Sequence, residues 1–252
     1  MKTIGNTFLI LLTALAIGLM GGCTKTDDPG NSGNVINNGG GNNGNNEGYG
    51  TYNGHEYVDL GLPSRTLWAT CNVGASSPEG YGNYYAWGEI TPKNTYFWST
   101  YKYCNGACDK LTKYCNMAGY SNYSFMDNLE VLQSSDDAAT SNWGSGWRMP
   151  TSNEWKELYN NTTNTWKTQN GVAGQLFTAS NGRSIFLPAA SSHWGGSELW
   201  GNGGQNGEYW SCSLGSYTPD QAIYLYFNSD NTMTSYDRRD VGKTIRPVRS
   251  SK

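Results

Sequence analysis

The stretch that decides the fold is Ala222–Phe227, which reads AIYLYF. Ile223, Leu225 and Phe227 occupy every second position, and tyrosines fill the places between them. Successive side chains of an extended chain point to opposite faces, so the residues at 223, 225 and 227 share one face. The pattern predicts a half-buried β-strand that packs this face on a core.

Other short apolar runs predict further strands, because Gly, Asn and Ser turns separate them. These runs are Glu56–Leu60, Thr66–Ala69, Tyr84–Trp87, Gln175–Thr178, Ser184–Leu187, Tyr209–Ser213 and Lys243–Val248.

One segment follows a helical pattern instead. Thr151 and Glu154 have the spacing of a capping box, and Trp155 and Leu158 recur three residues apart on one side. We therefore expect a helix from about Ser152 to Asn160. A second, shorter helix is expected near 136–141, capped by Ser135 or Asp136. Together the elements predict an α+β domain of mostly short antiparallel strands, with long loops.

The composition divides the chain into three parts. Residues 1–22 combine a positive start at Lys2 with the apolar run Phe8–Met20, which is typical of an export signal and short for a membrane span. Residues 23–52 consist largely of Gly and Asn, which predicts a disordered tether. Residues 53–250 are expected to form one globular domain.

The signal ends in the sequence LMGGC, residues 19–23, which resembles the lipobox of bacterial lipoproteins. This resemblance implies cleavage before Cys23 and lipidation of that cysteine, so that lipid anchors the chain to a membrane. An ordinary signal peptide is the alternative. The acidic pair Asp27-Asp28 resembles the surface-export signal of lipoproteins in the Bacteroides group, which implies the outer face of the outer membrane; a solvated linker charge and a periplasmic orientation remain alternatives.

The overall charge argues against a nucleic-acid partner. The net charge is −3 and the pI is about 5.4, whereas phosphate binding needs a basic patch. With 10 Trp and 18 Tyr, the chain is suited to an aromatic core and to a surface that binds through ring faces. No cofactor motif is present in the sequence.

Six blocks resemble the "Fibrobacter succinogenes major paralogous domain" family. They are EYVDLGLPS (56–64), LWATCNVGA (67–75), YYAWGE (84–89), WRMPT (147–151), YWS (209–211) and IRPVR (245–249). The family is similar in fold to C-type-lectin-like domains and to sulfatase-modifying enzymes, and it implies no settled activity. We interpret four tryptophans in these blocks, Trp68, Trp87, Trp147 and Trp210, as core residues.

Five cysteines remain if Cys23 carries lipid. An exported protein meets an oxidising compartment, which favours disulfides. Cys104 and Cys115 flank a segment that is compatible with a hairpin, so we expect these two to be bridged. Pairings of either with Cys108 are the alternatives. A zinc site from the three thiols lacks an evident fourth ligand.

Catalytic chemistry finds little support. His55 and His193 are the only histidines, and no spacing singles out a carboxylate pair. The likeness to sulfatase-modifying enzymes lacks their cysteine pair, since Cys212 stands alone near the C-terminal strands. A calcium-type lectin site is unsupported too, because Thr218-Pro219-Asp220 is not followed by Trp-Asn-Asp. We therefore expect no enzyme and no metal.

The long loop Ser191–Glu208 is the predicted ligand site, because lectin-like folds bind ligands at a long loop in this part of the chain. Its expected contacts are Trp194, Trp200, His193, Glu198 and Gln205. The alternative is that the two tryptophans fold back onto the domain. The preferred function is a surface binding or adhesion module for a glycan or a protein partner. The alternatives are a structural component of the cell envelope and, less favoured, an enzyme related to sulfatase-modifying factors.

Overall fold

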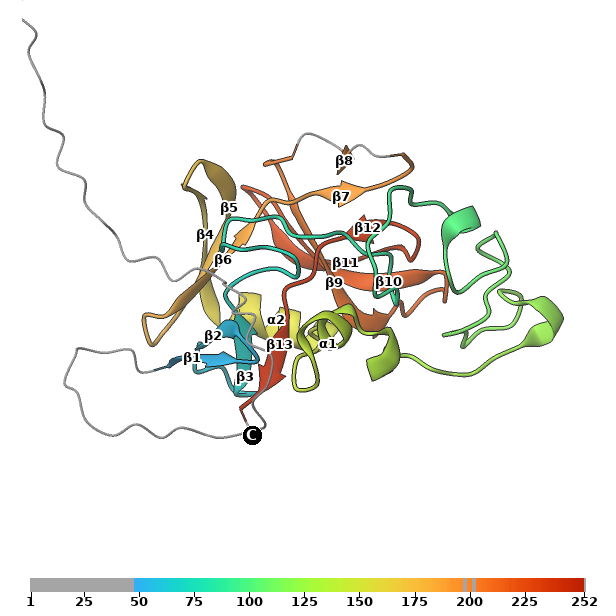
Figure 1. Cartoon of the computed structure of the whole chain (residues 1–252), viewed down its shortest axis with the longest axis horizontal. Coiled ribbons are helices and arrows are strands. Elements are labelled where there is room, and N and C mark those ends of the chain that lie inside the picture. Colours follow the sequence, from blue (N-terminus) through green and yellow to red (C-terminus); the bar gives the residue numbers. More distant parts are fainter. Residues whose placement is uncertain (1–47, 197–198, 201–202, 252) are drawn as a thin grey trace, which may run out of the picture.

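The computed structural model describes residues 48–196, 199–200 and 203–251, with the backbone alone at 199–200. The predicted signal peptide, Cys23 and the tether up to residue 47 lie outside this range. The described chain mixes four small sheets of mostly short antiparallel strands with two short α-helices, in agreement with the α+β class (Figure 1). None of the described helices is long and apolar enough to cross a membrane.

The sheet that holds both ends of the described domain has the order β1-β2-β3-β13. Its strands are β1 (Tyr49–Tyr52), β2 (His55–Asp59), β3 (Thr66–Ala69) and β13 (Val248–Ser250). β13 pairs antiparallel with β3, which places Val248 opposite Trp68. The C-terminal strand therefore lies one strand away from the N-terminal hairpin.

The predicted tether boundary at residue 52 is wrong, because β1 pairs with β2 along its whole length. Asn53 and Gly54 connect the two strands with positive φ values of 48° and 74°. A two-residue Asn-Gly turn of this kind matches the right-handed twist of a hairpin. The folded domain thus includes residues whose Gly- and Asn-rich surroundings favoured a tether.

Two three-stranded sheets form most of the remaining β-structure. One consists of β4 (Thr162–Gln169), β5 (Val172–Ala179) and β6 (Ser184–Pro188), and the other of β9 (Gly207–Leu214), β10 (Gln221–Phe227) and β11 (Thr232–Arg238), in the order β11-β10-β9. On β10 the side chains of Ile223, Leu225 and Phe227 are all buried, which confirms the face predicted from the alternation.

The last sheet is a small ribbon with the order β12-β7-β8. Its strands are β7 (Ser192–His193), β8 (Leu199–Trp200) and β12 (Gly242–Lys243). In Figure 1, β7 and β8 lie at the top of the molecule, across from the terminal sheet at the bottom.

Two of the predicted strands differ from the structure. The segment Lys243–Val248 is split between β12 and β13, because its middle hydrogen-bonds to several separate segments and Pro247 has no N–H for a ladder. The segment Tyr84–Trp87 forms only a single bridge, from Tyr85 to Lys243.

The helices are α1 (Ala138–Trp143) and α2 (Ser152–Asn160), and short 3₁₀ turns lie at Trp98–Thr100, Asn122–Ser124 and Ser134–Asp136. α2 has the predicted bounds. Its capping box is formed: the Glu154 N–H donates to Thr151 Oγ1 at 3.1 Å, and the Thr151 N–H donates to Glu154 Oε2 at 2.8 Å. α1 begins two residues later than predicted, because Asp137 caps it by accepting the Thr140 N–H.

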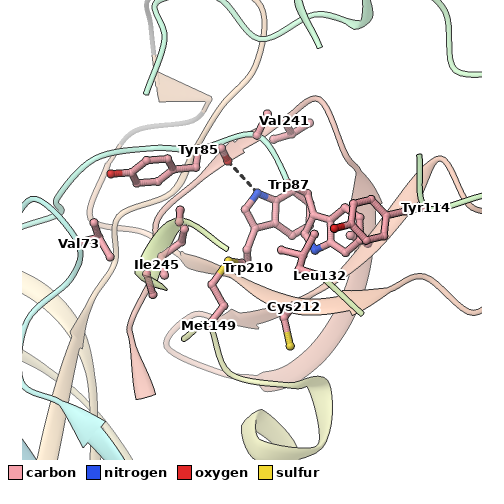
Figure 2. Packing of buried hydrophobic residues seen from close by; sticks show 14 of the residues in the cluster. Val73, Tyr85, Trp87, Tyr114, Leu132, Met149, Trp210, Cys212, Val241 and Ile245 are labelled. Atoms are coloured by element: carbon pink, nitrogen blue, oxygen red, sulfur yellow. Dashed lines mark hydrogen bonds between the residues drawn. The ribbon is translucent and has the colours of Figure 1, made fainter. Parts of the chain in front are cut away.

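The core is predominantly aromatic, and the four tryptophans assigned to it are buried. The indole nitrogens of three of them, Trp87, Trp147 and Trp210, reach backbone carbonyls, whereas that of Trp68 has no hydrogen-bond partner among the described residues. Trp210 Nε1 donates to the Tyr85 carbonyl at 2.9 Å, as Figure 2 shows, and Trp87 Nε1 donates to the Ser211 carbonyl at 2.8 Å. Buried indole N–H groups need such partners, so these bonds help to fix the register between β9 and the segment 85–87.

The predicted disulfide between Cys104 and Cys115 is not formed, since both are free thiols. The chain reverses earlier than expected, and Cys104 pairs with Leu111 across the turn. The thiols consequently point to different partners: Cys104 donates to the Trp98 carbonyl at 3.1 Å, and Cys115 donates to the Met117 carbonyl at 3.4 Å. The alternative pairings through the third cysteine of this cluster are absent as well, because it is also free.

Candidate functional site

The predicted binding loop carries β7 and one prominent exposed ring, Trp194, of which 43% is exposed. His193 is half-buried beside it, and Gln205 is exposed further along the loop. Glu198 lies outside the described residues. Trp200 belongs to β8 by its backbone, and its side chain also lies outside what the structure describes. Trp194 and His193 are therefore the two predicted contacts around which a site can be built.

The strand alternation of β7 separates two cavities. Ser192 and Trp194 line a cavity of about 210 Å³ together with Asp237, Arg238 and Val241. His193, whose side chain points the other way, lines a second cavity of about 220 Å³.

Arg238 is the fixed charge of the first cavity. Its Nε donates to Asp240 Oδ1 at 3.0 Å and its Nη2 donates to Asp240 Oδ2 at 2.6 Å, a bidentate pair that orients the guanidinium. The guanidinium carbon lies 5.6 Å from the ring centre of Trp98 and 5.7 Å from that of Trp194. Arg238 thereby links two aromatic rings that are distant in sequence.

The segment before Trp98 is attached to the binding loop through its backbone. The Tyr96 N–H donates to the Gly195 carbonyl at 2.8 Å, and the Gly195 N–H donates back to the Tyr96 carbonyl at 3.1 Å. Phe97, 44% exposed, lies against Gly195. Phe97, Trp98 and Trp194 together form what we call the aromatic platform.

The second cavity is lined by Gly82, Asn83, Tyr84, Pro92, Lys93, Asn94, Tyr96 and His193. The His193 ring packs edge-on against Tyr84, with centroids 4.3 Å apart, and is tilted against Tyr96 at 5.8 Å. Burial raises the pKa of Tyr84 well above its ordinary value and the pKa of Tyr96 to about 12. Both phenols are therefore neutral at physiological pH. Their hydroxyl groups already donate to the carbonyls of Ala190 and Tyr84, so they offer a ligand ring surface rather than charge.

Sequence reasoning missed Phe97, Trp98, Asp237 and Arg238. Only the fold brings them to Trp194, because they belong to segments far from the loop along the chain. The one local signal was the run of three aromatic residues at 96–98. Among the described residues, no cluster of three or more His, Cys, Asp or Glu side chains has the arrangement of a metal site.

Comparisons with known proteins identify no relative of this chain. No family model matches the chain, and neither a curated protein nor a solved structure gives a match.

Proposed function

We propose that the chain is a cell-surface lipoprotein whose C-type-lectin-like domain, of the major paralogous family that its sequence blocks resemble, is a non-catalytic module that binds glycans. The observation that carries the proposal is the exposed Trp194 ring beside a cavity that also presents Asp237 and Arg238. An exposed indole next to fixed polar groups is suited to ligand contact.

The size of the first cavity favours one sugar ring of an extended glycan. At about 210 Å³ it is smaller than the roughly 300–1,000 Å³ typical of pockets that enclose a drug-sized molecule. A pyranose presents C–H groups on one face and hydroxyls at its edge. In this site the indole of Trp194 contacts the C–H face, while Asp237 Oδ1 and the Arg238 guanidinium hydrogen-bond the hydroxyls.

The position of the aromatic platform agrees with display away from a membrane. β7 lies across the molecule from β1, where the chain enters the domain (Figure 1). If lipid on Cys23 anchors the chain to the outer membrane, a tether that enters at β1 leaves the aromatic platform on the side of the domain that faces away from the membrane. The membrane, through this lipid, is the first partner in the proposal, and the glycan is the second.

The test is a glycan array probed with the full chain in detergent, in parallel with Trp194→Ala and Tyr123→Ala. Tyr123 is fully exposed and lies in the segment 122–124, so it controls for loss of any surface ring. We expect Trp194→Ala to lower affinity by about 30-fold, since an aromatic hot spot contributes about 2 kcal/mol or more. We expect Tyr123→Ala to bind like the parent, and a chelator to have no effect. Absence of binding by the parent chain would sink the proposal.

One observation favours the second candidate, a structural component of the envelope. The segment 117–131 exposes Met117, Tyr123, Phe125, Met126 and Val131, and residues 117–126 include no charged side chain. Exposed apolar residues gathered in one segment are typical of protein contacts. Loss of assembly in Tyr123→Ala, with glycan binding unchanged, would favour this role.

A further inference from the structure

A fully buried amine, that of Lys243 on β12, contacts two carboxylates at once. Its Nζ lies 2.6 Å from Asp237 Oδ2 at the end of β11 and also contacts Glu208 Oε2 on β9. In the described part of the chain, the other lysines that form ion pairs each contact one carboxylate. We call these three side chains the Lys243 triad.

Aromatic rings shield the triad from water. Lys243 Nζ lies 4.1 Å from the ring centre of Tyr224 and 5.2 Å from that of Trp210. The side chain of Glu208 is almost completely buried, and that of Asp237 is about one-third exposed at the edge of the first cavity. The electrostatic interaction between charges in such a site is stronger than it would be in water.

We propose that the Lys243 triad is the site of an autocatalytic amide cross-link between Lys243 Nζ and the side-chain carboxyl carbon of Asp237. The ammonium first gives a proton to Glu208. Glu208 passes this proton to Asp237 Oδ2, and the nitrogen lone pair attacks the Cγ of the neutral acid, forming a C–N bond. Asp237 Oδ2 then takes a second proton from the nitrogen, the Cγ–Oδ2 bond breaks, and Oδ2 leaves as water. Glu208 ends as it began, and no other reactant is required.

The hydrogen bonds of the two carboxylates assign their roles. Asp237 Oδ1 accepts the backbone N–H of Arg238 at 2.8 Å, so negative charge that develops on this oxygen during attack is stabilised. Glu208 Oε1 is held by Asn206 Nδ2 at 2.6 Å, which leaves Oε2 facing the amine. Asp237 is therefore the acceptor, and Glu208 is the general base and acid.

The resting amine of the triad is protonated. Burial lowers the pKa of Lys243 and the two carboxylates raise it by more, so Nζ rests as an ammonium and must lose a proton before it can attack. The reaction needs only its internal transfer from the amine to Glu208, which leaves the net charge of the site unchanged.

Peptide mapping of the full chain tests the proposal. An amide at Lys243 blocks tryptic cleavage there, so the peptide Asp240–Arg249 remains joined to Ser184–Arg238. We expect a joined species lighter by one water than the sum of the two peptides, with fragment ions that place the bond at Asp237. Lys113 is the internal control, because its Nζ lies 2.6 Å from Asp136 without a second carboxylate contact; it should be cleaved normally.

Two variants test the mechanism. Glu208→Gln preserves the shape of the side chain but cannot accept the proton, and Lys243→Arg removes the nucleophile; each should lose the joined species completely. Near-ultraviolet circular dichroism checks that each variant is folded, and the parent digest decides the proposal if one is not. Quantitative recovery of Asp240–Lys243 with a free lysine amine from the parent chain overturns the proposal. A bond that maps to Glu208 overturns the assignment of roles.

Discussion

Arg148 and Glu154 are joined by two short hydrogen bonds at the start of α2, from Nη1 to Oε2 at 2.7 Å and from Nη2 to Oε1 at 2.6 Å. Glu154 also accepts the Thr66 hydroxyl at 2.7 Å, which ties the helix to β3. Burial raises the pKa of Glu154, but the bonds from Arg148 and from the Thr151 N–H outweigh it and lower this pKa to about 2.

The first prediction is an acid-sensitive stability that depends on Glu154. The unfolded chain protonates this group near its ordinary value of 4.5, and the folded chain only near 2. The contribution, about 3 kcal/mol, is therefore complete above pH 4.5 and is lost as the pH falls toward 2. Urea unfolding at a series of pH values should show this slope, and Glu154→Gln should flatten it, whereas Asp109→Asn on the exposed surface should not. Equal slopes in parent and Glu154→Gln would contradict the assignment.

The second prediction separates exposed from buried tryptophans by stability. Trp194→Ala should change the free energy of unfolding by about 1 kcal/mol or less, because 43% of the side chain is exposed. Trp210→Ala should cost about 3–5 kcal/mol, since it empties a fully buried site. Chemical denaturation measures both. A large loss in Trp194→Ala would mean that the ring is structural.

The third prediction concerns the close approach of two strands at Gly207. A Cβ at this position would lie 2.0 Å from Cζ of Phe227 on the neighbouring strand. Gly207→Ala should therefore destabilise the domain by about 1–3 kcal/mol through overpacking. Gly196→Ala is the matched control, because a Cβ there meets nothing within 4 Å. Similar melting temperatures for the two variants would be inconsistent with this packing.

The fourth prediction concerns thiol reactivity. Cys104 and Cys108 are partly exposed, whereas Cys115 and Cys212 are buried, and burial raises the pKa of Cys212 to about 12. Because the thiolate is the reactive form, an alkylating reagent should label Cys104 and Cys108 in the folded chain, and the buried pair only after unfolding. Mass mapping before and after denaturation measures the difference. Rapid labelling of Cys212 in the native chain would show that β9 opens readily.

The fifth prediction concerns the proposed anchor. Cys23→Ala should release the chain from the membrane fraction and abolish incorporation of a tagged fatty acid, because the proposal assigns the lipid to this thiol alone. Cys108→Ala serves as the control and should remain labelled and membrane-bound. Fatty-acid labelling that persists in Cys23→Ala would place the lipid elsewhere.

The sequence predicted correctly those elements whose signals lie entirely within the element itself. The capping box and the spacing of Trp155 and Leu158 lie within one helix, so the bounds of α2 were predictable. The same holds for the buried face of β10. In contrast, β4 is a mostly polar edge strand with the sequence TTNTWKTQ, which has no apolar alternation by which to recognise a strand. It is extended mainly because it pairs with β5 along its whole length.

The candidate site was predictable only in part, because its residues meet through the fold. Trp194 lies in a loop that its composition marks as unusual. The sequence left open whether this ring is exposed or folds back onto the domain, and in the structure 43% of the side chain is exposed. The contacts of Arg238 with Trp98 and Trp194 depend on the positions of three separate segments. Local spacing carries no information about such a contact, so neither Arg238 nor Trp98 was expected there.

The hairpin of β1 and β2 has a mechanical consequence. A pull transmitted through the N-terminal segment reaches β1 first, and this edge strand has no fully buried residue and pairs only with β2. Under such a load the four residue pairs between β1 and β2 separate in sequence from Tyr49 onward. β3 and β13 stay paired on the other side of the sheet. The domain thus has a short extensible section at its base, and its lengthening reaches the core only at Tyr52, whose carbonyl accepts the indole N–H of the buried Trp147.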